Sequence, residues 1–297
     1  MNAISVRKIA KTYAGKPPIL ALKDISFDVK KGELFGLIGP DGSGKTSLFR
    51  ILTTVLLADA GTAQVEGLDV VKDFKKIRTM VGYMPGKFSL YQDLSVEENL
   101  TFFANVFNTS IEENYHLIKD IYVQIAPFKD RKAGKLSGGM KQKLALCCAL
   151  IHKPKVLFLD EPTTGVDPVS RSEFWEMLKK LKPEGITILV STPYMDEAVL
   201  CDRIAMMQEG KILSIDTPQL IVAQYDKPLY AIKASNNYLL LQTLRQDPLV
   251  DSCYMFGEFL HLRPKGDIAL LMKGLNASCS QIEPSIEDCF IELMKLS

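Results

Sequence analysis

The segment Gly39–Thr46 (GPDGSGKT) restricts the fold of this 297-residue chain more than any other feature. It follows the short apolar run Leu34–Ile38 and leads into the helix-favouring stretch Gly44–Leu52. Glycines let backbone N–H groups close around phosphate oxygens without a side-chain clash, and a helix start directs its positive end at the same charge. In this pattern the lysine reaches the β- and γ-phosphates, and the hydroxyl of the last residue ligates Mg²⁺. The order strand, loop, helix therefore predicts a phosphate-binding α/β fold.

Strand and helix signals alternate along the chain to about residue 215. This alternation predicts a mainly parallel sheet covered by helices, with ligands at the carboxyl ends of the strands. A capping box, Ser95 with Glu98, opens a helix that runs to about Val106. The other expected elements are strands at Val156–Asp160 and Ile186–Ser191 and helices at Gly138–Ile151 and Ser170–Leu181.

The pattern changes after Asp216-Thr217-Pro218 to a split βαβ plan with one further helix. We therefore expect two domains, 1–217 and 218–297, the second being a small α+β accessory domain. Its expected strands are Leu229–Ala234, Val250–Phe256, Phe259–Arg263 and Cys279–Glu283, and its expected helices are Tyr238–Arg245, Asp267–Leu275 and Pro284–Leu296.

Composition excludes several classes of protein. The 36 Lys and Arg nearly balance the 35 Asp and Glu, so neither a basic stripe nor an acidic tail is available to coat a polyanion, and we expect no nucleic-acid partner. The most apolar runs, Leu144–Ile151 and Ile186–Val190, fall far short of the roughly 20 residues that a membrane span requires. The amino terminus lacks a signal-peptide pattern, so we expect a cytosolic chain. The six cysteines form no CxxC pair and are expected to be buried, reduced thiols.

Two carboxylates emerge from the end of the predicted strand Val156–Asp160. Asp160 can hold Mg²⁺ through water, and Glu161 can orient or deprotonate an attacking water. A strand that ends in acidic residues is common, so this signal gains its weight from the glycine-rich loop.

The stretch Leu136–Gln142 marks a second helix start. Ser137 suits the N-cap position, and Gly138 and Gly139 leave backbone N–H groups bare. Either this is a second phosphate-binding helix start or it is an ordinary capped helix.

Taken together, these residues resemble the ATP-binding cassette (ABC) ATPases over roughly residues 4–215. Gly39–Thr46 is similar to the Walker A loop, Leu157–Glu161 to Walker B and Leu136–Gln142 to the family signature sequence. Thr164–Asp167 looks like the D-loop that crosses a dimer interface. The resemblance implies a P-loop NTPase fold of ABC type, with a mainly parallel sheet core and a helical signature subdomain over about 88–152.

The resemblance also assigns roles to single residues. Those that it places on ATP are Tyr13, Gly39, Pro40, Asp41, Gly42, Ser43, Gly44, Lys45, Thr46 and Ser47. It implies that Thr46 and Asp160 ligate Mg²⁺, that Glu161 is catalytic and that Asp167 belongs to the D-loop. The signature residues Leu136, Ser137, Gly138, Gly139 and Met140 would act on the ATP held by another subunit. For Tyr13, expected to stack on adenine, the alternative is a half-buried strand tyrosine.

Three segments are most similar to cassettes of ABC-2-type multidrug exporters: Gly82–Pro85, Leu90–Leu100 and Pro284–Phe290. In such systems separate subunits span the membrane. The resemblance therefore implies a permease partner, ATP-driven cassette dimerisation and a peripheral location on the cytoplasmic face of the inner or plasma membrane. It places the permease contact around Phe88–Leu94, with Phe88, Leu90 and Tyr91 as apolar anchors. Ordinary packing of the helical subdomain is the alternative.

The chain departs from the family pattern at two positions. Gly86 stands where the family has a glutamine that ligates Mg²⁺ and links nucleotide to permease. Pro193 stands where the family has a histidine, and it offers neither a titratable nitrogen nor a backbone N–H. We expect the chain's own Walker site to hydrolyse ATP poorly. This favours pairing with a different cassette over pairing with itself, because two defective sites would leave little turnover.

Two other functions stay open. A regulatory module could bind ATP without hydrolysing it and act through binding alone. A soluble ABC ATPase of translation or DNA repair would need tandem cassettes or a long coiled coil. The sequence has a single GxxxxGKT and no sustained heptads, which disfavours that class.

Overall fold

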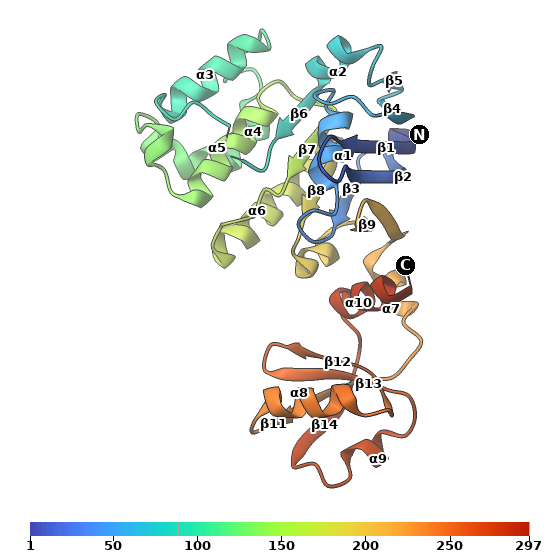
Figure 1. Cartoon of the computed structure of the whole chain (residues 1–297). Helices are drawn as coiled ribbons and strands as arrows, with labels where there is room; N and C mark the ends of the chain where they lie inside the picture. Colours follow the sequence, from blue (N-terminus) through green and yellow to red (C-terminus); the bar gives the residue numbers. More distant parts are fainter. Residues whose placement is uncertain (88, 297) are drawn as a thin grey trace. The chain divides into compact units, whose positions relative to one another are not determined.

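The computed structural model describes residues 1–87 and 89–296. The chain forms two compact units (Figure 1), the first comprising Met1–Pro218 together with the end of the chain from Leu293, and the second comprising Gln219–Glu292. The assignment of all of 218–297 to an accessory domain stays a prediction. Within the described residues, no helix has both the length and the apolar character needed to cross a bilayer.

A six-stranded sheet forms the centre of the first unit. Its strands, in spatial order, are β10 (Lys211–Asp216), β9 (Arg203–Gln208), β3 (Leu34–Ile38), β8 (Thr187–Thr192), β7 (Val156–Asp160) and β6 (Val81–Met84). Only the β10–β9 ladder is antiparallel. Every residue of β3, β7 and β8 is buried, as expected of parallel strands covered on both faces. The predicted mainly parallel sheet is confirmed.

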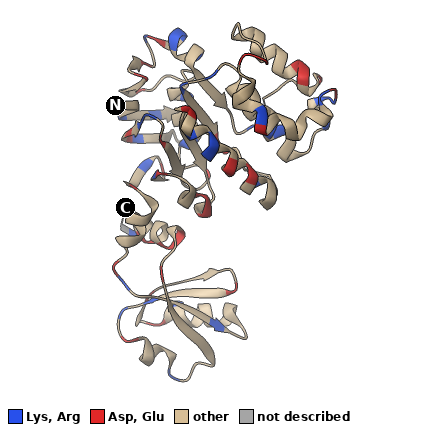
Figure 2. Cartoon of the chain, turned by 180° about the vertical axis from the view of Figure 1, so that it is seen from behind, with Lys and Arg blue, Asp and Glu red and all other residues tan. Residues whose placement is uncertain are grey.

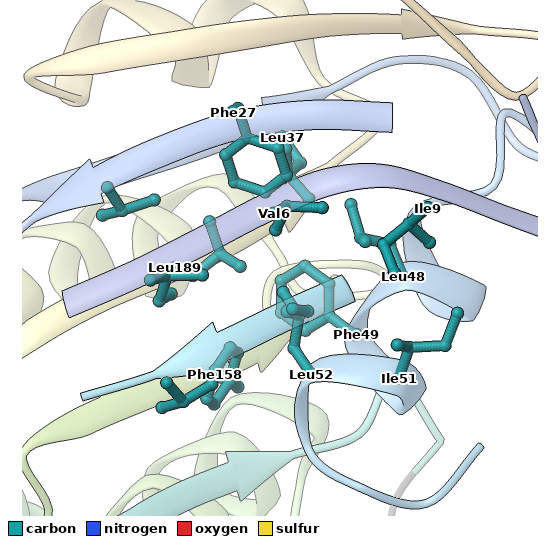
Figure 3. Close-up of a cluster of buried hydrophobic side chains, with 14 of the residues drawn as sticks. Val6, Ile9, Phe27, Leu37, Leu48, Phe49, Ile51, Leu52, Phe158 and Leu189 are labelled. Atoms are coloured by element: carbon teal, nitrogen blue, oxygen red, sulfur yellow. The ribbon is translucent and has the colours of Figure 1, made fainter. Parts of the chain in front are cut away.

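A second, antiparallel sheet in the same unit has the order β2-β1-β4-β5. Its strands are β1 (Asn2–Tyr13), β2 (Ile19–Lys30), β4 (Ala60–Val65) and β5 (Leu68–Asp69). Apolar side chains of both sheets enclose helix α1 (Lys45–Leu52), which buries Leu48, Phe49, Ile51 and Leu52 (Figure 3). Phe49 of α1 meets Phe158 of β7 edge to face, with 6.0 Å between ring centroids. This packing fixes the helix that follows the glycine-rich loop.

The remaining helices of the first unit are α2 (Phe74–Met80), α3 (Val96–Val106), α4 (Tyr115–Ile125), α5 (Gly138–Leu150) and α6 (Pro168–Leu181). The capping box at α3 is confirmed, since Ser95 Oγ accepts from the Glu98 N–H and Glu98 accepts from the Ser95 N–H. Helix α6 begins two residues before the expected Ser170. The reason is that Asp167 is its N-cap, accepting from the Ser170 N–H at 3.0 Å, and Pro168 occupies the first turn.

The second unit contains a four-stranded antiparallel sheet with the order β12-β13-β11-β14, the arrangement of a split βαβ fold. Its elements are β11 (Leu229–Ala234), α8 (Asn237–Gln246), β12 (Val250–Phe256), β13 (Phe259–Pro264), α9 (Ile268–Met272) and β14 (Ala277–Ile282). Two further helices, α7 (Pro218–Ala223) and α10 (Ile286–Leu296), flank these elements in the chain. The core consists mainly of Ile232, Leu244, Leu260 and Leu262.

Several expectations differ from this structure. Strand β14 spans Ala277–Ile282 rather than Cys279–Glu283, and helix α10 begins at Ile286 rather than Pro284. Helix α9 ends at Met272 rather than Leu275, because Gly274 takes a left-handed conformation with φ of +85°. Helix α7 was not expected at all. Cys279 is exposed on β14, so the expectation that all six cysteines are buried is wrong for this residue.

Candidate functional site

The glycine-rich loop joins β3 to α1 and depends on two of its glycines for close backbone approach. Gly44 has a φ of +105°, and a Cβ on it would lie 2.4 Å from the carbonyl oxygen of Ala21. A Cβ on Gly39 would lie 2.2 Å from the carbonyl oxygen of Met207. The turn between β9 and β10 also supports the loop, since the Gly210 N–H donates to the Ser43 carbonyl at 3.1 Å. Any larger residue at Gly39 or Gly44 would force the loop to move.

Helix α1 begins without a capping side chain. Gly44 is its N-cap, and no acidic residue lies in its first turn. N–H groups at a helix start have no partner within the helix and carry the positive end of its dipole. The start of α1 can therefore accept an anionic ligand.

The Lys45 ammonium is almost fully buried, with 3% of the residue exposed. It donates to the carbonyl oxygens of Gly39 at 2.8 Å and Pro40 at 3.0 Å. It also forms an ion pair with Glu161 Oε1 at 3.2 Å. The loop therefore wraps around the Lys45 ammonium, and a phosphate bound by the loop would contact this charge.

Oxygen donors suited to a divalent cation converge on the carboxylate of Asp160, which is 2% exposed at the end of β7. Thr46 Oγ1 donates to Asp160 Oδ1 at 3.2 Å, and Ser191 Oγ donates to the same atom at 2.7 Å. Hydroxyl and carboxylate oxygens are the ligands that Mg²⁺ prefers, and the ion usually keeps several waters and binds substrate phosphates. The donor set of Thr46 and Asp160 fits Mg²⁺ on these grounds.

Glu161 has a backbone conformation that is rare for a residue with a side chain, with φ of +52°. Its N–H donates to the carbonyl oxygen and to Oγ of Ser191, at 3.1 and 3.0 Å, so the end of β8 holds it in place. Such strained residues concentrate at active sites. Here the conformation brings the carboxylate to Lys45.

A cavity of about 650 Å³ lies over the loop. Ten of its lining residues are Tyr13, Ile19, Leu20, Asp41, Gly42, Gly44, Lys45, Thr46, Ser47 and Glu161. Tyr13 is half-buried, and its hydroxyl lies 3.0 Å from Ser47 Oγ. The carbonyl oxygens of Gly39 and Pro40 accept from Lys45. The buried Ser43 hydroxyl has no hydrogen-bond partner among the residues that the structure describes. Most of the loop thus lines one cavity together with Tyr13 and Glu161, and Asp160 adjoins it through Thr46.

The five signature residues do not line this cavity. Leu136 is buried, whereas Ser137 and Gly138 are exposed at the start of α5. Ser137 caps that helix, with Oγ accepting from the Met140 N–H at 3.3 Å. Within one chain, the structure does not bring the two glycine-rich helix starts to the same site.

Sequence reasoning assigned no role to Glu197, which is 2% exposed. Its carboxylate accepts from Thr192 Oγ1 at 2.5 Å, Thr163 Oγ1 at 3.1 Å and Arg171 Nε at 3.1 Å. It therefore ties the end of β8 to the loop after Glu161 and to α6. The acidic pair Asp196-Glu197, which begins four residues after the end of β8, was the available signal, but only tertiary structure identifies its partners.

The two positions that depart from the family pattern, 86 and 193, lie beside the ends of β7 and β8. These strands also position Asp160 and Glu161. A Cβ on Gly86 would lie 3.0 Å from the carbonyl oxygen of Asp160, so this position adjoins the end of β7. Pro193 follows Thr192 at the end of β8 and is half-buried. Position 86 thus adjoins the backbone of Asp160 and the Cβ of Glu161, and position 193 follows the strand that holds Glu161.

The three residues expected to contact a permease fall into different environments. Phe88 lies outside the described residues. Leu90 is 7% exposed, whereas Tyr91 is 50% exposed and packs against Phe102 with 4.7 Å between ring centroids. Leu90 lines a second cavity of about 260 Å³, whose mainly apolar wall also includes Val55, Tyr83, Pro85, Phe103 and Phe107.

Comparison with known proteins identifies the family of the chain. Residues 22–164 match the ABC transporter family. The chain is 37% identical over 302 residues to the probable multidrug ABC transporter ATP-binding protein YbhF of Escherichia coli (strain K12), covering 98% of this chain and 52% of YbhF. It is 38% identical over 222 residues to the Nod factor export ATP-binding protein I of Burkholderia lata, covering 74% of this chain and 72% of that protein.

Among solved structures, the ATP-binding cassette MJ0796, a dimer in a post-hydrolysis state with ADP and Pi, matches with a TM-score of 0.66 at 26% identity. The match covers 72% of this chain and 98% of MJ0796. The chain spans about half the length of YbhF and about a quarter of the plant ABC transporter A family members that it also matches. The fold and site define a P-loop nucleotide-binding protein. The chain belongs to the ABC transporter ATP-binding family.

Proposed function

We propose that the chain binds and hydrolyses ATP as the nucleotide-binding subunit of an ABC exporter whose membrane-spanning segments lie in other subunits. The observation that carries this proposal is the convergence of Lys45 and Thr46 with Asp160 and Glu161, from two segments far apart in the sequence. The named relatives, one a probable multidrug transporter component and one a Nod factor export component, support export over import.

In this proposal the N–H groups at the start of α1 and the Lys45 ammonium bind the phosphates of ATP, and Tyr13 stacks on the adenine. Thr46 and Asp160 hold Mg²⁺, which supplies neutralisation of phosphate charge. Glu161 is the general base that orients or deprotonates the attacking water. Lys45 forms an ion pair with Glu161 at 3.2 Å, so phosphates that bind the Lys45 ammonium compete with this carboxylate.

A second cassette completes each site in this proposal. Ser137 and Gly138 are exposed, Gly139 is half-buried, and none of the three lines the cavity, so we expect this helix start to cap a nucleotide held by another subunit. Asp167 starts α6 beside the same surface, and its carboxylate is committed to the Ser170 N–H, which lowers its pKa. Gly86 and Pro193 make the chain's own site a poor catalyst, so a different cassette is the favoured partner.

The apolar cavity of about 260 Å³ is the proposed docking site for the permease. Its wall combines Pro85 and Leu90, next to the degenerate position 86, with Phe103 and Phe107 of the helical region. A short apolar segment of a membrane subunit fits such a groove. In this proposal the chain lies at the cytoplasmic face of a membrane.

Hydrolysis by the purified chain tests the proposed defect. One missing transition-state group typically costs about 10²–10³ in rate, so we expect turnover well below about 1 s⁻¹. The double variant Gly86→Gln with Pro193→His should regain part of this loss, and adding Glu161→Gln to it should abolish the gain. Turnover above about 1 s⁻¹ in the unmodified chain would contradict the defect.

A regulatory ATP-binding module that does not hydrolyse ATP is the second candidate, favoured by Gly86 and Pro193. Purification of the tagged chain from its native membranes in detergent distinguishes the two. A transporter subunit copurifies with a multi-span protein, whereas a soluble regulator does not.

A further inference from the structure

A basic surface lies on α2 and the turn before it. We define it by the exposed cations Lys72, Lys75, Lys76 and Arg78. Two exposed apolar side chains lie among them, Val71 at 55% and Phe74 at 37%. The whole chain carries a net charge of only +1, so this group of positive charges is a local feature. Figure 2 shows Lys and Arg in blue on this part of the chain.

Local structure directs the cations outwards. Ile77 is fully buried and anchors α2, which leaves the other sides of this short helix to solvent. The nearby acidic groups are used within the turn: Asp69 accepts from the N–H groups of Val71 and Lys72, both at 2.9 Å, and Asp73 accepts from the Asp69 N–H at 3.2 Å. The carboxylates therefore serve to shape the turn.

Arg78 joins this helix to a second exposed segment. It donates to Oγ1 and to the carbonyl oxygen of Thr54, both at 2.8 Å, and its guanidinium lies 5.2 Å from the Phe74 ring centroid. The segment after Thr54 exposes Val55 at 63% and Leu57 at 65%. Cations and apolar side chains are thus combined on adjoining segments.

We propose that this basic surface contacts the anionic headgroups of the membrane while its apolar side chains enter the interface. Mixed cationic and apolar side chains bind anionic bilayers, because long basic side chains reach the headgroups and apolar groups enter the acyl boundary. The placement rests on the proposed function: Val55 and Arg78 also line the cavity proposed to receive the permease, so both surfaces face the same side. Binding to a fluid membrane surface requires charged side chains that are long enough to reach the headgroups, and the basic surface has them.

Vesicle cosedimentation of the full chain tests the proposal. We expect binding to vesicles of phosphatidylcholine with phosphatidylglycerol, weakened by salt, and little binding to phosphatidylcholine alone. The triple variant Lys72→Gln, Lys75→Gln, Lys76→Gln should lower the partition coefficient about 100-fold, since each cation contributes about 1 kcal/mol and about 1.4 kcal/mol is tenfold. Phe74→Ser should lower it several-fold.

A control variant removes the same charge elsewhere, at the exposed Lys119, Lys227 and Lys273, each replaced by Gln. It should bind anionic vesicles almost as well as the unmodified chain. Equal binding to both kinds of vesicle, no loss in the triple variant, or an equal loss in the control would overturn the proposal.

Two further measurements separate this proposal from the function on which it rests. ATP affinity of the triple variant should be unchanged, because the substituted side chains lie outside the nucleotide cavity. Copurification with the permease in detergent, without a bilayer, should also persist. If vesicles do not bind the chain and the triple variant loses the permease in detergent, the basic surface binds an acidic protein segment and the membrane proposal is wrong.

Discussion

The helix starts of α1 and α5 are both glycine-rich and both similar to phosphate-binding motifs, yet they are built differently. At α1 the N-cap is Gly44, no side chain caps the helix, and Lys45 is buried beside Glu161. At α5 the Ser137 hydroxyl accepts from the Met140 N–H, and the helix start is exposed. In the proposed function, the first start has its catalytic partners in the same chain, whereas the second has none among the described residues.

This difference indicates how each start obtains its ligand. The α1 start has no capping side chain, and residues of the same chain surround it. It can therefore bind a nucleotide without a second subunit. At the start of α5, the Met140 N–H already donates to Ser137 Oγ. Because a hydroxyl can both donate and accept, Ser137 can still form a hydrogen bond with a ligand from another subunit. The start of helix α10 is closed by reciprocal capping. Asp288 accepts from the N–H and hydroxyl of Ser285, and Ser285 Oγ accepts from the Asp288 N–H.

The largest expected effect is on nucleotide affinity at the open start. Lys45→Ala removes a buried ammonium, and loss of its charged hydrogen bonds should weaken ATP binding by about 3 kcal/mol, or roughly 100-fold. Titration of the purified chain with a fluorescent ATP analogue measures this. Lys143→Ala is the matched control on α5, where Lys143 pairs with Glu173 at 2.6 Å, and it should leave the affinity unchanged. A comparable loss in the control would end the distinction between the two starts.

The second-largest expected effect is on stability at the closed start of α10. Burial alone would raise the pKa of the Asp288 carboxyl, but hydrogen bonds from His261, Ser285 and Tyr254 outweigh burial and lower it. A lowered pKa in the folded state gives stability that is complete above the unfolded value, about 3.9 for an aspartate, and lost as pH falls through the folded value. Asp288→Asn should cost about 2–3 kcal/mol at neutral pH.

Hydrogen exchange of β13 and α10 amides reports this local stability. The unmodified protein should lose protection below about pH 4, while the Asn variant should start lower and change less across that range. Ser285→Thr, which keeps the hydroxyl, is the control. An Asn variant with full protection at neutral pH would show that the carboxylate does not close this helix start.

The sequence predicted much of both units, because its strongest signals are local. Strands β3 and β11 have the expected limits, and the capping residues of α3 and α5 act as expected. Local patterns fail where a boundary depends on a neighbouring side chain: Asp167 sets the start of α6. The contacts of Glu197 with Thr163 and Arg171 join residues more than 25 positions apart, which no spacing pattern contains.

The contact predicted around Tyr91 illustrates a different limit. An apolar segment in a sequence does not indicate which side chains are buried, and here neighbouring candidates separate into buried Leu90 and exposed Tyr91. The exposure of Cys279 has the same cause, since β14 is at the sheet edge next to β11 and four of its six residues are exposed. Burial is a property of the assembled sheet.

The third prediction tests the cap of α5. Ser137→Ala removes the hydroxyl that holds the Met140 N–H and should reduce stability by about 1 kcal/mol. Urea unfolding followed by fluorescence of the single tryptophan, Trp175, which is buried on α6, measures this. Ser137→Thr retains the cap and should be close to the unmodified protein. ATP affinity of the isolated chain should stay constant, and a fall in affinity would mean that α5 already belongs to the chain's own site.

The smallest effect separates the two signature glycines. A Cβ on Gly138 would lie 3.5 Å from the Gly165 carbonyl oxygen, an ordinary contact, whereas one on Gly139 would lie 2.8 Å from Ser170 Oγ. Alanine is favoured over glycine in a helix by up to about 1 kcal/mol, so Gly138→Ala should leave stability unchanged or slightly higher, as measured by the same urea unfolding. Gly139→Ala should lose that gain, and adding Ser170→Ala should recover part of it by removing the nearest atom. If both single variants are equally stable, close packing against α6 is not what requires Gly139, and exposure of its N–H to a ligand from another subunit becomes the better reason for a glycine there.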